Sequence, residues 1–314
     1  MLWMAVTLTG YFFNAVTALI DKYLLAGHIK APAVYAFFVS LFSLFALLFM
    51  PFGFRFFGWQ TTGLFLLSGM LFLYGLLVFY FSVQRWEISR ASPLLGTVVS
   101  VTALSAVFLP GAFAEESFTL MHILALLLLI SGGFLISFDL PLKRGENVSV
   151  KVIAAGITIG VSLLLLKYGY ARANSNFISG FVWSRIGMFA AGLSLFTVPV
   201  FRAQILEALK QFSMASKPLR HTGWVFVINK ICGGAAGFLI TYATFLGPIS
   251  FVQALSGIQY VFLLALVFPL SLRYPKVFGE RLFFWDWFQR ASAIAFISLG
   301  LWIFATSGIK LLLI

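Results

Sequence analysis

Two cations lie deep within apolar stretches of the sequence, where a charge is costly. Arg185 lies within the run 177–200 and Lys230 within the run 223–246. At 1.5 Å per residue of a helix, each lies roughly 12–13 Å from the start of its run. A Lys or Arg at the centre of a bilayer costs roughly 2.5–3.5 kcal/mol and usually faces a cavity or a partner. We predict that both face a binding cavity; the alternative is a hydrogen bond to helix carbonyls or to neighbouring polar side chains.

Polar and aromatic side chains accompany these cations. Gln253, Ser256 and Tyr260 are spaced three and four residues apart, so they share one face of a helix. Small polar side chains in membrane helices are also common as interhelical packing contacts, which is the alternative for this face. The predicted substrate-binding residues are Arg185, Lys230, Trp183, Asn229, Gln253, Ser256, Tyr260 and Asn14. Lys167 lies nearer the end of its run, and we expect its ammonium group to reach the interface.

Acidic side chains are not expected at the same depth. Asp21, Glu87, Asp139 and Asp286 all fall at the expected ends of apolar runs. A cavity with uncompensated positive charge favours an anionic or carboxylate-bearing solute. Proton coupling usually relies on a buried acid, so the sequence favours a facilitator or an exchanger unless Asp21 or Glu87 reaches inward.

Motifs for catalysis, nucleotide binding or metal binding are not found in the sequence. There is neither a Gly-x-x-x-x-Gly-Lys-Ser/Thr loop nor a glycine fingerprint after a strand, and the three histidines and one cysteine are far apart. We therefore expect no enzyme activity, no cofactor and no metal. An integral-membrane enzyme acting on lipids is an alternative that needs a His, Asp or Ser cluster at one interface.

The composition indicates a polytopic membrane protein. Hydrophobic residues make up 61% of the chain and charged residues 10%, whereas soluble domains carry about 25% charged residues. The net charge of +12 raises the question of nucleic acid. However, the cations are scattered singly between apolar runs, so we interpret them as topology signals and expect no nucleic-acid partner.

Ten apolar runs are candidates for membrane-spanning helices, which need about 20 residues each. They cover residues 2–20, 33–50, 63–83, 92–110, 120–138, 152–170, 177–200, 223–246, 249–270 and 289–307. None alternates with polar residues as the strands of a barrel do. The expected fold class is therefore all-α integral membrane, with a polar interfacial segment at 201–221.

The polar stretch Asp139–Lys151 divides these runs into five and five. In each half the fourth run begins with small residues and proline, and an acidic turn separates it from the fifth. An odd number of spans inverts the second unit, as in many secondary transporters. We predict a first five-helix repeat over 1–139, a cytoplasmic connector over 140–151 and a second five-helix repeat over 152–314.

The acidic turns carry a family resemblance. Gly279-Glu280-Arg281, and less closely Ala114-Glu115-Glu116, resemble the turn that ends each repeat in the drug/metabolite transporter superfamily, in particular its EamA-like members. The resemblance covers essentially the whole chain. It implies ten helices as two inverted repeats around a central cavity, and alternating access, but no particular substrate.

The expected function is accordingly a secondary transporter, either a permease or exporter or an exchanger, of small organic metabolites. We expect it in the plasma membrane of a prokaryote, as a monomer or homodimer. A flippase for an anionic lipid-linked precursor is the alternative within transport; a lateral opening between helices favours it.

The basic residues predict an orientation. Fifteen of the 21 Lys and Arg residues fall in loops after odd-numbered runs, and three after even-numbered runs or at the C-terminus. Because cytoplasmic loops are enriched in Lys and Arg, odd loops should face the cytoplasm and both termini the outside. Members of the similar family are often described with both termini inside; the charge bias favours the opposite orientation.

Overall fold

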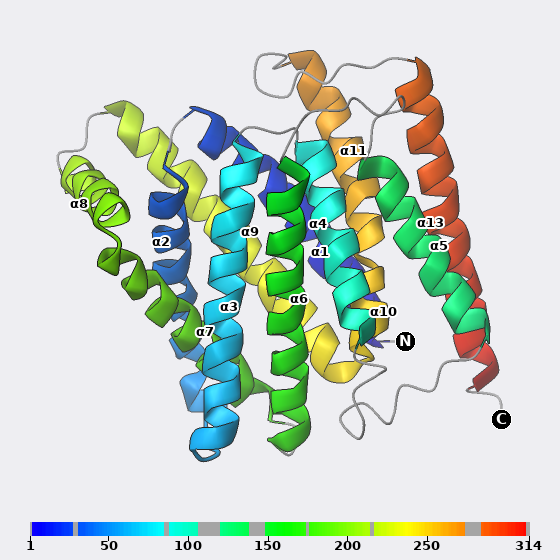
Figure 1. The fold of residues 1–314 in the computed structure, drawn as a ribbon, viewed down its shortest axis with the longest axis horizontal. Helices are drawn as coiled ribbons and strands as arrows, with labels where there is room; N and C mark the ends of the chain where they lie inside the picture. Colours follow the sequence, from blue (N-terminus) through cyan, green and yellow to red (C-terminus); the bar gives the residue numbers. More distant parts are fainter. Residues whose placement is uncertain are drawn as a thin grey trace.

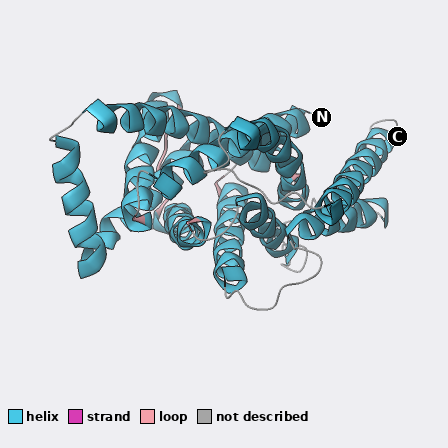
Figure 2. Ribbon diagram, turned by 90° about the horizontal axis from the view of Figure 1, so that it is seen from above, coloured by secondary structure: helices cyan, strands magenta, loops and turns pink. Residues whose placement is uncertain are grey.

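The computed structural model describes residues 2–27, 31–84, 88–105, 120–137, 148–173, 176–213, 217–273 and 284–311. Seen from above, these ranges form a bundle in which the helix is the only regular element (Figure 2). The helices are α1 (Leu2–Gly27), α2 (Pro32–Ser43), η1 (Leu44–Phe52), α3 (Trp59–Val83), α4 (Ile88–Leu104), α5 (Leu120–Ser137), α6 (Val148–Arg172), α7 (Phe177–Ser194), η3 (Leu195–Thr197), α8 (Pro199–Ser213), α9 (Lys217–Leu246), α10 (Ile249–Ala254), α11 (Ser256–Arg273) and α13 (Phe284–Leu311). The described part of each apolar run predicted from the sequence falls on one to three of them; residues 106–110 and 138 of the predicted runs lie outside the described residues.

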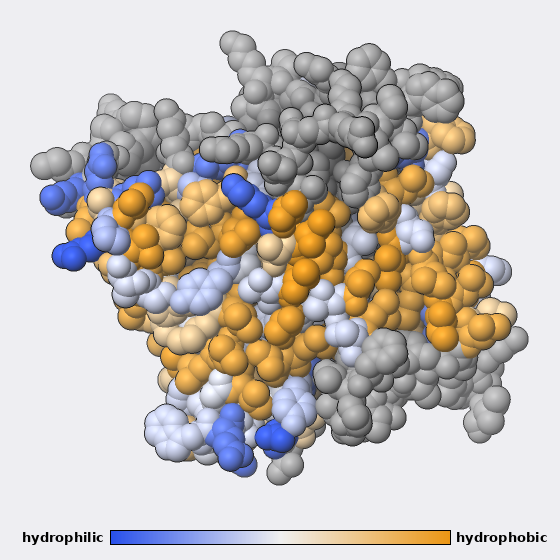
Figure 3. Space-filling view, viewed as in Figure 1, coloured by the Kyte–Doolittle hydropathy of each residue, from blue (hydrophilic) through white to orange (hydrophobic). Residues whose placement is uncertain are grey.

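Seven helical segments in the described part of the chain are long and apolar enough to cross a membrane. They are Leu2–Leu25, Pro32–Phe52, Trp59–Val83, Val150–Arg172, Phe177–Thr197, Gly223–Leu246 and Ile249–Ser271. Shorter apolar segments lie within α4, α5 and α13. Figure 3 shows apolar side chains across the middle of one face and hydrophilic ones toward its upper and lower edges. The protein is therefore an all-α membrane protein.

The first helix is longer than predicted. The run 2–20 was expected to end at Asp21, but α1 continues to Gly27, so Asp21 lies inside the helix. The side chain of Asp21 is only 13% exposed, because Lys230 of α9 lies against it. A charge that has a buried partner need not mark the membrane surface, and this expected boundary is wrong for that reason.

The polar segment after the seventh run forms the separate helix α8 at the left edge of the bundle (Figure 1). Arg202, Glu207 and Lys210 are exposed on it, whereas Ile205 is fully buried. A helix with one buried and one charged face suits an interface. The expected segment 201–221 overlaps α8, although its last residues already belong to α9, which begins at Lys217.

The predicted connector 140–151 is described only in its last part. Residues 148–151 form the first turn of α6, and Lys151 is exposed there. The rest of the connector, both acidic turns that carry the family resemblance, and Glu87 and Asp139 lie outside the described residues. Asp286 belongs to the first turn of α13.

Helices from the two halves of the chain are interleaved (Figure 1). α1 packs along α9, α3 packs between α6 and α7, and α5 packs along α13. The contact between α3 and α7 needs two glycines, because a Cβ atom on Gly69 would overlap the carbonyl oxygen of Ser184, and one on Gly187 would overlap that of Leu66. The two backbones therefore touch without intervening side chains.

We expect Gly69→Ala to lower the thermal unfolding temperature of the purified protein. The added methyl group must displace the backbone of α7, and overpacking of this kind costs about 1–3 kcal/mol. Gly63→Ala in the same helix is the matched control, since a Cβ there meets nothing within 4 Å. Equal unfolding temperatures for the two variants would contradict the close contact.

Candidate functional site

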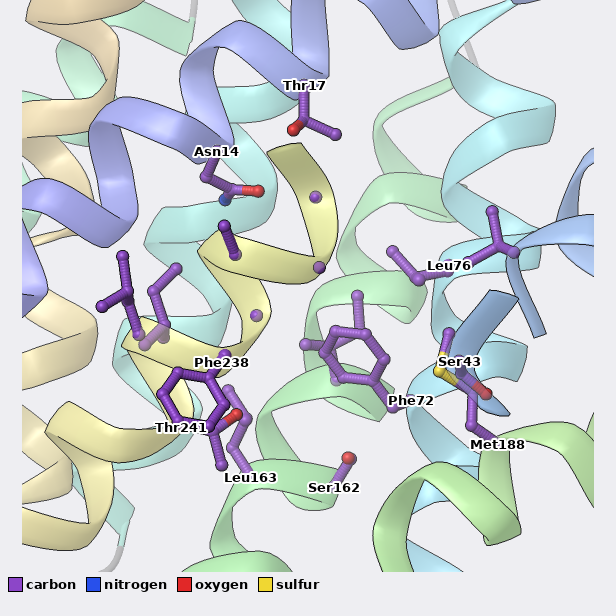
Figure 4. A pocket seen from close by; sticks show the side chains of 18 of the residues that line it. Asn14, Thr17, Ser43, Phe72, Leu76, Ser162, Leu163, Met188, Phe238 and Thr241 are labelled. Atoms are coloured by element: carbon purple, nitrogen blue, oxygen red, sulfur yellow. The ribbon is translucent and has the colours of Figure 1, made fainter. Parts of the chain in front are cut away.

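A cavity of about 880 Å³ lies inside the bundle. Its walls come from α1, α2 with η1, α3, α4, α6, α7, α9, α10 and α11. Figure 4 shows Asn14 and Thr17 of α1, Leu76 of α3 and Phe238 of α9 around it. The volume is within the range of small-molecule sites, about 300–1,000 Å³, and like those sites the cavity is mostly apolar with a few polar groups.

Six of the eight predicted binding residues line this one cavity: Arg185, Lys230, Gln253, Ser256, Tyr260 and Asn14. Trp183 and Asn229 do not. The indole Nε1 of Trp183 donates to the carbonyl oxygen of Arg55 at 3.2 Å, and its ring packs 5.2 Å from that of Phe54. Trp183 thus holds the segment after η1, and Asn229 belongs to the polar network beside the cavity.

This polar network joins α1, α2 and α9. The Nζ atom of Lys230 lies 3.4 Å from Oδ1 of Asp21 and donates to the hydroxyl of Tyr35 at 3.0 Å. The Tyr35 hydroxyl in turn donates to Asp21. The fully buried Asn229 donates from Nδ2 to Asp21 at 2.5 Å and to Tyr35 at 2.9 Å. The carboxylate therefore accepts three hydrogen bonds or charge contacts, as a buried charge requires.

The network corrects the expectation that both cavity cations lack a counter-charge. Lys230 is 8% exposed and paired with Asp21, so the two charges cancel. Asp21 also reaches inward, which removes the argument against proton coupling that rested on the lack of an acid. Tyr35 was not predicted; its hydroxyl within the apolar run 33–50 is the signal that could have found it, because a buried Tyr O–H usually has a partner.

Arg185 has a different environment. Its Nη1 donates to the sulfur of Met188 at 3.6 Å, and its guanidinium carbon lies 4.9 Å from the ring centre of Phe181 and 5.8 Å from that of Phe72. A Cβ on Gly237 would lie 3.1 Å from Nη2, so the guanidinium reaches across to α9. Within the described residues no carboxylate pairs with Arg185. A sulfur atom and aromatic rings are weak partners, and this cation remains available to an anion in the cavity.

The polar face of the ninth predicted span surrounds a break in the helix. α10 ends at Ala254 and α11 begins at Ser256. Carbonyl groups near the break accept side-chain hydrogen bonds: Val252 from the Tyr11 hydroxyl at 3.0 Å, and Gln253 from the Ser100 hydroxyl at 2.7 Å. Hydroxyl groups of α1 and α4 thus satisfy acceptors in α10, on the N-terminal side of the break.

The side chains of this face differ in how many of their polar atoms have hydrogen-bond partners. Tyr260 donates to the carbonyl oxygen of Ser92 at 3.0 Å, and Asn14 donates to Gln259 at 2.9 Å, so both also connect helices. The Oε1 atom of Gln253 accepts from Tyr11 at 3.3 Å, but its buried Nε2 has no acceptor among the described residues. Gln253 lines the cavity, and its amide nitrogen is a buried donor that has no acceptor among the described residues beside it.

Aromatic rings fill the bundle at one end of the cavity. Phe177 lies within 6 Å, centroid to centroid, of each of the rings of Phe181, Phe238, Tyr242 and Phe245. Phe181 and Phe238 also line the cavity. The cluster makes this part of the cavity wall apolar, and Phe181 joins it to Arg185, whose guanidinium carbon lies 4.9 Å from the centre of the Phe181 ring.

Lys167 does not line the cavity and does not simply extend to the interface. Its Nζ donates to the carbonyl oxygens of Thr244 and Gly247, both at 2.9 Å. These carbonyls end α9, where a helix leaves acceptors unsatisfied and favours positive charge. Lys167 therefore caps α9 from α6. The described residues contain no group of three His, Cys, Asp or Glu side chains that could hold a metal ion.

Comparison with known proteins identifies the fold alone. No family model and no curated protein sequence matches the chain. Chains of solved structures do match; one of them, titled only "Crystal structure of protein", has a TM-score of 0.59 and 14% sequence identity over 98% of this chain and 99% of the other. At this identity the similarity shows a shared fold over the full length, and the function must come from the site.

We expect Asp21→Asn to destabilise the protein more than the double change Asp21→Asn with Lys230→Met. The single change leaves the Lys230 ammonium buried without a counter-charge, and loss of one partner from a buried pair costs about 3–5 kcal/mol. The double change removes both charges together. Thermal unfolding of the two variants measures the difference, with Lys210→Gln on the exposed face of α8 as the control. Equal destabilisation by the single and the double change would show that the pair is not a unit.

Proposed function

We propose that the protein is a secondary transporter that moves small organic anions across a membrane by alternating access. The observation that carries this proposal is Arg185, a cation without a carboxylate partner among the described residues, in a cavity enclosed by helices of both halves of the chain. A protein that only supports membrane architecture has no need of such a cavity, whose cost in packing and charge burial is high.

The proposed architecture is ten helices in two inverted repeats of five. Under this scheme α1 corresponds to α6, α2 to α7, α3 to α9, α4 to α10 with α11, and α5 to α13. The packing supports the scheme: α1 packs along α9 just as α6 packs along α3, and the equivalent helices α5 and α13 pack on each other. The similarity to EamA-like transporters is part of the proposal, as are a prokaryotic plasma membrane and a cytoplasmic face at the odd-numbered loops.

The same scheme suggests how the cavity alternates between the two sides. α3 and α7 are in close backbone contact through Gly69 and Gly187, whereas the backbones of the corresponding helices α9 and α2 come close at few points and the two helices are joined through side chains. If α9 and α2 came into close contact while α3 and α7 separated, the cavity would close toward one side of the membrane and open toward the other. The η1 segment favours such movement, because a long stretch of 3-10 helix within a span often marks a hinge.

The test is uptake of a panel of small carboxylates and organic phosphates by proteoliposomes that contain the purified protein. We expect Arg185→Gln to reduce kcat/KM for the transported anion by about tenfold or more, since a hydrogen bond to a charged group contributes about 1.5–3 kcal/mol. Arg172→Gln is the matched control, because Arg172 is exposed at the end of α6. Equal uptake by Arg185→Gln and the wild type, or uptake of cations alone, would refute the proposal.

A further inference from the structure

The cavity extends to the outer surface of the bundle between η1 and α9. Phe45 is 63% exposed and Ile231 is 66% exposed, yet both also line the cavity. Gly234, one turn beyond Ile231, is exposed as well, and a Cβ on it would meet nothing within 4 Å. These residues therefore belong both to the cavity wall and to the exposed apolar surface of the bundle.

Aromatic pairs bound this opening along the helices. The rings of Phe42 and Phe226 lie 5.6 Å apart on one side of it, and those of Phe49 and Phe238 are stacked at 5.2 Å on the other. Phe226 and Phe238 are separated by about 18 Å along α9 at 1.5 Å per residue. We call the opening between these two pairs, at Phe45, Ile231 and Gly234, the side window.

The unpaired cation lies directly inside the side window. The Nη2 atom of Arg185 is 3.1 Å from the Cβ position of Gly237. Gly237 lies three residues from Gly234, or about 4.5 Å along the helix axis. A planar guanidinium binds a carboxylate or a phosphate with two parallel hydrogen bonds. The distance from an anionic group on Arg185 to the lipid is thus no more than the length of a short alkyl chain.

We propose that the protein binds anionic amphiphiles, with the headgroup on Arg185 and the hydrocarbon tail in the lipid through the side window. This inference rests on the proposed function and names its substrate class. Transfer of a tail from lipid through water costs roughly a factor of four in equilibrium constant per methylene. Lateral entry avoids that cost, and the apolar rim of Phe45 and Ile231 accommodates the tail while only the headgroup enters the cavity.

The probe is dodecyl phosphate with a photoreactive diazirine in the middle of its chain, added to the full-length protein in lipid nanodiscs. Mass spectrometry of the irradiated protein should place the label on peptides that contain Phe45, Ile231 or Gly234. We expect Arg185→Gln to reduce the labelling about tenfold, and Gly234→Trp or Ile231→Trp to reduce it similarly by filling the side window. Arg172→Gln and Leu127→Trp, on exposed positions away from the window, should leave it unchanged.

Butyl phosphate separates this inference from the proposed function, because it binds Arg185 without needing the window. If its binding and uptake depend on Arg185 and both tryptophan variants bind the dodecyl probe as the wild type does, the side window is refuted and anion transport stands. If neither phosphate ester depends on Arg185, both proposals fail. Loss of the dodecyl probe alone in the tryptophan variants supports the side window.

Discussion

Ionised side chains within an apolar bundle must each find a counter-charge, hydrogen-bond partners or water. Lys230 meets this requirement through Asp21 and Tyr35, to which Asn229 also donates, and this network fixes α1, α2 and α9 together. Arg185 meets only a methionine sulfur and two phenylalanine rings. Among the described residues the bundle therefore keeps one neutral ion pair and one unbalanced positive charge beside the same cavity, and the proposed preference for anions rests on that difference.

Glycine residues determine where the charge of Arg185 lies, because they set how closely the helices around it approach. The close approach of α3 and α7 through Gly69 and Gly187 holds α7 firmly, and Arg185 extends from α7 across the cavity. On the other wall, Gly237 leaves room for the guanidinium and Gly234 leaves the bundle open. One wall is thus packed backbone to backbone, and the opposite wall is loose and reaches the lipid, which suits a binding site that must also open.

The sequence pattern predicted where the helices lie and which cations lie deep within them. It did not predict the interaction partners of the charged side chains. The described part of every predicted apolar run lies mainly on helices, because a backbone in lipid must satisfy its own hydrogen bonds. Depth along a run placed Arg185 and Lys230 at the cavity, but not Asp21, whose partner is more than 200 residues away in the chain. Trp183 and Asn229 do not line the cavity, because proximity in sequence to a cavity residue does not fix the direction of a side chain on the helix. The side window has no sequence signal, since Phe45 and Ile231 resemble any lipid-facing residues.

The unbalanced charge of Arg185 is the centre of this account, and reversal of that charge tests it most directly. Solid-supported membrane electrophysiology on proteoliposomes records the charge moved by the wild type and by Arg185→Glu on addition of matched anionic and cationic solutes. The account predicts currents with anions for the wild type, and loss of these currents with a gain of response to cations for Arg185→Glu. Unchanged anion currents in Arg185→Glu would contradict it.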